Sequence, residues 1–122
     1  MKFIIAIHRA ERILDYVFTD VWGPTKMTSL GGMHYFVLFI DDFSRRCWVY
    51  TMRHKGKVLN LFVVWKKHTE KYTRRKIKIL YSDNGREYTS DSFLQLCHNE
   101  GIERHFTVKE TSQLNMVAER MN

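Results

Sequence analysis

The sequence has few cysteines and no long apolar run. Its two cysteines, Cys47 and Cys97, lack CxxC spacing. Lone cysteines of this kind are typical of reduced thiols in an intracellular protein, and a disulfide between them is the alternative. No apolar segment approaches the length of a membrane span, and the apolar stretch at residues 3–7 is short for a secretory signal. His8 has no His and Cys partners for a tetrahedral zinc site, so we expect no zinc in this chain.

Positive charge is what the sequence has in excess. The formal net charge is +7, from 20 Lys and Arg against 13 Asp and Glu. Such a balance suits a polyanionic partner or a membrane surface, and charge alone does not choose between them. The chain has 122 residues, of which 44% are hydrophobic. It can therefore bury a core, and it fits one domain.

Two aspartates stand at the ends of predicted strands. An apolar run over 77–83 stops at Asp83, where Asn84-Gly85 turns the chain, and a run over 13–20 stops at Asp20 before the breaker Gly23-Pro24. If these strands are parallel neighbours, both aspartates open into the crevice at the carboxyl ends of the sheet. Glu119 follows Asp83 after thirty-five residues (119 − 83 − 1) on a predicted helix, and it can close the group.

A group of three carboxylates has a clear chemical implication. Such groups repel one another, so in a folded protein they normally indicate bound hard cations or raised pKa values. Mg²⁺ or Mn²⁺ is the expected cofactor. Two such ions, about 3.5 to 4 Å apart, can activate an attacking oxygen and stabilise the leaving oxygen of a phosphoryl displacement.

The remaining periodicity predicts an α/β fold. Apolar and alternating runs indicate further strands, and apolar residues at three- and four-residue steps indicate helices. The predicted strands are 13–20, 35–40, 46–52, 77–83 and 102–108; the predicted helices are 57–72, 92–100 and 111–122. The first three strands form an antiparallel meander, and the 57–72 helix crosses over to the strand that ends at Asp83.

Several polar residues allow two interpretations. Asp41 and Asp42 are a rival acidic pair for a metal, or they cap a turn. His98 and His105 are either metal ligands or, since they have no paired spacing, ordinary surface or core histidines. A basic run is either a solvated face or a patch that contacts phosphates. The candidate phosphate contacts in this run are Lys66, Lys67, Arg74, Arg75 and Lys76.

Several motifs, in this order, carry a resemblance to a known family: LDYVFTDVWGP, SLGGMHYFVLFIDDFSRRCWVY, SDNGREY, GIERHFTV and NMVAERMN. They resemble the integrase catalytic core of copia-type LTR retrotransposons, over residues 13–122, whereas residues 1–12 do not match. The resemblance implies an RNase H-like five-stranded mixed sheet of order 3-2-1-4-5, flanked by helices. It also implies a catalytic and metal-binding triad of Asp20, Asp83 and Glu119.

The activity that the resemblance implies is metal-dependent DNA strand transfer. Element ends and target DNA are the expected partners, with a homo-oligomer left open and no membrane. The expected location is intracellular, and nuclear where the protein is active. Three alternatives remain: a catalytically inactive nucleic-acid-binding remnant, an RNase H-like nuclease that uses the same acids with water as the nucleophile, and a purely structural or partner-binding domain.

The sequence departs from the family pattern near the predicted site. Ser112, Leu114 and Met116 replace the proline, second glutamine and glycine of the usual TPQQNG. Arg86 stands where the family tends to have a second glycine, and it is a candidate phosphate contact. Asn115 lies one helical turn before the third acid, so it could position a phosphate or that acid. Since the chain stops three residues after the acid, we expect the C-terminal helices to be missing, as in a polyprotein fragment or a decayed element copy.

Overall fold

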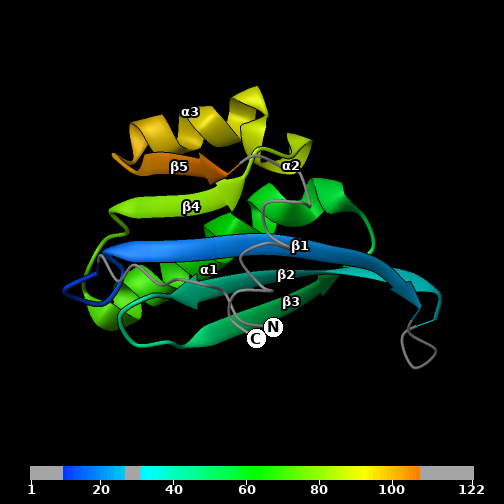
Figure 1. Ribbon diagram of the computed structural model, residues 1–122, viewed down its shortest axis with the longest axis horizontal. Coiled ribbons are helices and arrows are strands. Elements are labelled where there is room, and N and C mark those ends of the chain that lie inside the picture. Colours follow the sequence, from blue (N-terminus) through cyan, green and yellow to red (C-terminus); the bar gives the residue numbers. More distant parts are fainter. Residues whose placement is uncertain (1–9, 27–30, 108–122) are drawn as a thin grey trace.

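The computed structural model describes residues 10–26 and 31–107. Its centre is one five-stranded sheet in the order β3-β2-β1-β4-β5, which is the order predicted from the sequence (Figure 1). The first three strands pair antiparallel, and β4 and β5 run parallel to β1. The strands are β1 (Tyr16–Lys26), β2 (Met33–Asp41), β3 (Cys47–Met52), β4 (Ile79–Asp83) and β5 (Glu103–Thr107).

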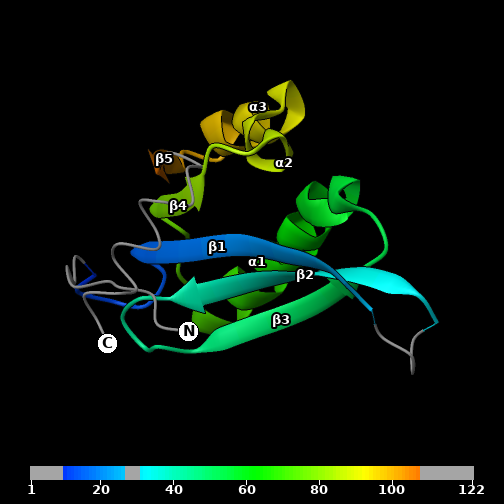
Figure 2. The ribbon, with the colours of Figure 1, turned by 45° about the vertical axis from the view of Figure 1, so that its right-hand side comes forward.

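The described helices lie on one side of this sheet (Figures 1 and 2). A 3₁₀ turn, η2 (Lys55–Lys57), leads into α1 (Val58–Thr73), and α2 (Arg86–Thr89) and α3 (Asp91–Asn99) follow β4. The apolar stripe of α1 packs on the sheet: the Trp65 ring stacks on Phe39 at 4.6 Å, and Phe62 reaches Phe93 of α3 at 5.1 Å. The 3.6-residue period therefore predicted both the helix and its buried face.

Strand β1 is the main correction to the predicted elements. We expected it to end at Asp20 before Gly23-Pro24, but it continues to Lys26. The register with β2 shifts between Trp22 and Thr25, and the glycine and proline lie inside this irregularity. A proline is tolerated at such a bulge because the residue there does not have to donate a backbone hydrogen bond to the neighbouring strand. Gly23 has φ +124°, and a Cβ there would come within 2.8 Å of the backbone oxygen of His34.

The Asp41-Asp42 pair caps a turn, so the rival metal-site interpretation is wrong for these residues. Asp41 is fully buried. One of its carboxylate oxygens accepts the backbone N–H of Leu14 at 2.7 Å and the other that of Ser44 at 2.8 Å. Asp42 accepts the backbone N–H of Ala10 at 3.4 Å and pairs with Arg45 at 3.3 Å. Both carboxylates therefore hold the β2–β3 hairpin to the segment before β1.

Two smaller expectations concern cysteines and the membrane. Both cysteines are free thiols, with Cys47 exposed and Cys97 buried, so the alternative of a disulfide between them is wrong. Within the described ranges, no helix has the length and apolar character needed to cross a membrane.

Candidate active site

The register of β1 and β4 brings two of the three predicted acids side by side. The strands pair in parallel up to Phe18 opposite Tyr81, whose rings lie 5.0 Å apart. Asp20 and Asp83 each lie two residues further along their strands, so they stand at equivalent positions. Because side chains alternate along a strand, both point to the same face as the Phe18 and Tyr81 rings. The two carboxylates therefore lie side by side just beyond the last parallel pair of β1 and β4, at the carboxyl end of β4.

The acidic side chains around Asp20 and Asp83 influence one another electrostatically. Burial raises the pKa of Asp20 to about 6, against an ordinary value of 3.8, and the negative charges of Asp83 and Glu87 add to the rise. The backbone N–H of Val21, which donates to Asp20 Oδ1 at 2.9 Å, opposes the shift. Burial is therefore the main cause of the raised pKa of Asp20, and the two neighbouring carboxylates are a smaller one.

Glu87 is an acid of this edge that sequence reasoning missed. It lies in α2, where its carboxylate returns toward Asp83 across Gly85. A Cβ built on Gly85 would lie 2.7 Å from Glu87 Oε2 and 2.9 Å from Asp83 Oδ1. The signal was present in SDNGREY, but it required the four-residue helix α2, which the sequence analysis did not predict.

A buried polar contact fixes the elements that carry these acids. The Thr19 and Tyr88 hydroxyls hydrogen-bond at 2.9 Å, and Tyr88 is fully buried. Arg104 of β5 donates to the Tyr88 carbonyl at 3.2 Å and to the Ser82 hydroxyl at 2.7 Å. Residues 19, 82 and 88 each stand next to an acid in the sequence. These hydrogen bonds therefore connect the backbone segments that carry Asp20, Asp83 and Glu87.

The third predicted acid cannot be placed relative to this pair. Glu119 and Asn115, with the expected 111–122 helix, lie outside the described residues. Among the residues that are described, no group of three or more His, Cys, Asp or Glu side chains is arranged to hold a metal ion. His105 instead pairs with Glu103 at 2.6 Å and contacts the Tyr16 hydroxyl at 3.3 Å.

Lys66 does not belong to a phosphate-contacting patch. It is buried on α1, and its ammonium reaches Glu70 at 2.9 Å and Glu100 at 2.6 Å. Although burial disfavours the charge, these two carboxylates hold the pKa of Lys66 above its ordinary value. The prediction failed because a run of like charges in the sequence does not reveal the acid that α3 brings against it.

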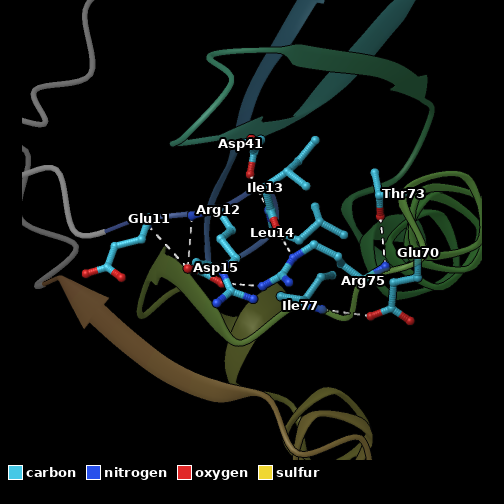
Figure 3. Close-up of polar contacts among 10 residues, drawn as sticks. All are labelled: Glu11, Arg12, Ile13, Leu14, Asp15, Asp41, Glu70, Thr73, Arg75 and Ile77. Atoms are coloured by element: carbon cyan, nitrogen blue, oxygen red, sulfur yellow. Dashed lines mark hydrogen bonds and ion pairs between the residues drawn. The ribbon is translucent and has the colours of Figure 1, made fainter.

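Arg75 has a structural role in the described part of the chain. Its guanidinium donates to the Ile13 carbonyl at 3.0 Å and to the Asp15 carboxylate at 2.9 Å (Figure 3). Asp15 in turn accepts the backbone N–H groups of Glu11 and Arg12. Arg75 thus ties the segment before β1 to the loop that follows α1, through its Nε and Nη2 atoms.

The other basic candidates are exposed, and they lie at two ends of the sheet. Lys67, Arg74 and Lys76 belong to α1 and the loop before β4, so they lie near the amino end of β4. Four steps along β4, from Ile79 to Asp83, separate that end from Asp83, roughly 13 Å at about 3.3 Å per residue. Arg86 instead follows Asp83 closely. It lines a cavity of about 530 Å³ whose other polar lining residues are Lys55, Glu87, Ser90 and Ser92.

Sequence comparisons identify related proteins. The family described as Integrase core domain matches residues 10–112. The chain is 47% identical, over its whole length, to the Retrovirus-related Pol polyprotein from transposon TNT 1-94 of Nicotiana tabacum, of which it spans 9%. Over 111 residues, or 91% of the chain, it is 31% identical to the Pol polyprotein from transposon RE2 of Arabidopsis thaliana, of which it spans 7%. The chain therefore corresponds to a small part of these polyproteins.

Solved structures support the fold. The simian T-cell lymphotropic virus intasome in complex with PP2A regulatory subunit B56 gamma contains a chain that matches 95% of this one, with a TM-score of 0.69 and 17% identity over 40% of that chain. The HTLV-2 integrase catalytic core domain in complex with magnesium matches 93% of this chain, with a TM-score of 0.65 and 17% identity over 68% of that chain. These likenesses establish an RNase H-like fold. With its matched residues, its copia-type plant relatives and this fold, the chain belongs to the integrase core domain family.

Proposed function

We propose that this chain is the catalytic core of a retrotransposon integrase and that it joins DNA ends to target DNA with divalent cations. Asp20, Asp83 and Glu119 are the proposed metal-binding and catalytic acids. The observation that supports this most directly is the β1–β4 register, which brings two acids from distant parts of the sequence to one sheet edge.

The chemistry of the described donors fits Mg²⁺ or Mn²⁺. Asp20 accepts one backbone N–H, from Val21, and Asp83 accepts one, from Gly85 at 2.8 Å. Within the described ranges, these carboxylates make no ion pair, so they retain free oxygen lone pairs of the kind that hard cations prefer. When bound, two such ions would polarise the attacking and leaving oxygens of an in-line displacement at phosphorus.

The protein's own part in this reaction is to hold charge and position. Asp20 and Asp83 hold two carboxylates on neighbouring strands. The buried hydrogen bond between Thr19 and Tyr88 holds β1 against α2. A site held this rigidly needs little rearrangement when the reacting phosphate arrives. Glu119 completes the proposed triad, and Asn115 orients it or a phosphate.

Exposed cations would bind the DNA backbone. Lys67, Arg74 and Lys76 supply charge near the amino end of β4, and Arg86 supplies it beside the acids. We expect affinity to fall with salt, because each phosphate contact releases condensed counterions. Since the substrates are element ends and chromosomal target DNA, the proposed reaction takes place in the nucleus, with the chain acting in a homo-oligomer.

A joining assay tests the proposal. The chain is incubated with labelled donor-end DNA, target DNA and Mn²⁺, and joined product is measured for wild type, Asp83→Asn and Asp91→Asn. Asp91 is an exposed acid of α3, so its variant loses the same charge away from the proposed site. We expect product with wild type and Asp91→Asn only.

The other outcomes separate the alternatives. Equal product from wild type and Asp83→Asn would exclude the proposed triad. Cleavage of an RNA–DNA hybrid without joining would indicate a nuclease that uses water. Salt-dependent DNA binding with no metal-dependent product would indicate an inactive binding remnant.

A further inference from the structure

The turn after β4 places a second carboxylate against Asp83. The point where a Cβ on Gly85 would sit lies 2.9 Å from Asp83 Oδ1 and 2.7 Å from Glu87 Oε2. The two oxygens are therefore no farther apart than the sum of these distances, about 5.6 Å. Gly85 is buried and has an ordinary backbone conformation, with φ −65°. It is the absence of a side chain, and not a special φ, that lets the carboxylates approach one another.

The backbone at Glu87 is held in place by its neighbours. Its helix α2 begins directly after Gly85, and the Tyr88 and Thr89 N–H groups donate to the Gly85 carbonyl at 2.9 and 3.1 Å. Tyr88, the next residue, is held by hydrogen bonds to Thr19 and Arg104. The Glu87 backbone therefore cannot move away from Asp83 without breaking buried contacts.

The Glu87 carboxylate forms no ion pair with a described residue, although Lys55 and Arg86 line the same cavity. It is half-buried, and no described residue donates a hydrogen bond to it or pairs with it. Two half-buried carboxylates at less than 6 Å repel one another, so a cation between or beside them would be strongly favoured.

We propose that Glu87 is a positioning residue for the divalent cation: it accepts hydrogen bonds from the ion's hydration water while Asp20 and Asp83 supply direct ligands. This inference rests on the proposed metal-dependent function and adds an acid outside the triad. Mg²⁺ dehydrates reluctantly and usually keeps several waters when one or two carboxylates bind it. An outer position for Glu87 agrees with the described arrangement, in which no three acids converge as direct ligands.

Binding of Mn²⁺ alone, without DNA, tests the inference. The free Mn²⁺ signal in electron paramagnetic resonance is followed as the 122-residue chain is titrated with the ion, for wild type, Glu87→Gln, Glu11→Gln and Asp83→Asn. Glu11 is an exposed glutamate before β1, at the opposite end of that strand, and it serves as the matched control. We expect Glu87→Gln to weaken Mn²⁺ binding by roughly 10- to 100-fold, as outer-shell variants commonly do. Glu11→Gln should stay within twofold of wild type.

The arms distinguish failure of this inference from failure of the proposed function. If Asp83→Asn loses Mn²⁺ but Glu87→Gln binds as wild type does, Glu87 has no such role, while the metal site stands. If wild type and Asp83→Asn bind alike, both ideas fail. Melting in EDTA shows whether Glu87→Gln is folded; we expect little change, because its carboxylate has no described partner. Gly85→Ala is the second variant: its Cβ must push the carboxylates apart, so unchanged Mn²⁺ affinity there would also overturn the inference.

Discussion

Replacing Asp20 by asparagine should stabilise the metal-free protein above neutral pH. The Asp20 carboxylate has a pKa of about 6 in the folded chain, against an ordinary value of 3.8. The difference of about 2 units corresponds to about 3 kcal/mol at 1.36 kcal/mol per unit. Asparagine keeps the oxygen that accepts the Val21 N–H but carries no charge, so it removes the cost of burying a carboxylate beside Asp83 and Glu87.

The sign of the pH dependence follows from linkage. Between pH 4 and pH 6 the folded chain binds more protons at Asp20 than the unfolded chain does, so the free energy of unfolding falls as pH rises through this window. Below pH 4 the carboxyl is protonated in both states and the cost is absent. Asp20→Asn lacks this contribution. Its advantage over wild type should therefore be near zero at pH 4 and reach about 3 kcal/mol above pH 7.

The assay is urea unfolding in EDTA at several pH values, followed by circular dichroism. Asp15→Asn is the control with the opposite sign: burial alone would raise the pKa of Asp15, but the Glu11 amide and Arg75 guanidinium hold it below its ordinary value. That variant should lose stability at neutral pH. A pH-independent difference between wild type and Asp20→Asn, or a less stable Asp20→Asn at pH 7, would refute the reasoning. Added Mn²⁺ should stabilise wild type more than the variant, because a ligand of the folded state alone shifts the equilibrium.

Two further predictions concern side chains that hold the fold. Lys66→Met should destabilise the chain by about 1 to 3 kcal/mol in urea, since it leaves Glu70 and Glu100 without their shared cation, while DNA affinity measured by fluorescence anisotropy stays constant. Lys67 is the next residue of α1, and it is exposed. Lys67→Met should leave the free energy of unfolding unchanged, weaken DNA binding and lower the salt slope of that binding by about one. Thr19→Val should cost about 1 to 3 kcal/mol, because it leaves the buried Tyr88 hydroxyl unpaired; a melting temperature equal to that of wild type would show that the contact is not needed.

The sequence predicted those features that depend on local pattern. The apolar run before Asp83 indicated a buried strand, and the observed β4 is that strand. The stripe through Phe62 and Trp65 indicated α1. Strand order came from the family resemblance, and the strand ends then fixed which residues could meet. The adjacency of Asp20 and Asp83 was therefore predictable, because it requires only two strands and their direction.

Features that depend on distant contacts were not predictable from local pattern. The short helix α2 is held by Tyr88 bonding to Thr19, and these residues are 69 positions apart. As long as α2 is not predicted, nothing in the sequence distinguishes Glu87 from an ordinary solvent-exposed glutamate. Lys66 was misassigned for the same reason, because its partner Glu100 is 34 positions away. In each case the deciding interaction joins elements whose packing no periodicity encodes.

The net charge of the chain hides an uneven distribution of acidic and basic side chains. The chain carries +7 overall, yet Asp20, Asp83 and Glu87 make one sheet edge locally negative. Exposed Lys67, Arg74 and Lys76 lie toward the amino end of β4, whereas Arg86 follows Asp83 closely. Under the proposed function, the distant cations would bind the DNA backbone away from the acids. A phosphate at the acids would meet three carboxylates, so a bound metal ion would first offset that repulsion and then assist the chemistry. The proposed DNA binding would therefore depend on the exposed lysines and arginines, whereas the proposed reaction at the acids would depend on a bound divalent cation.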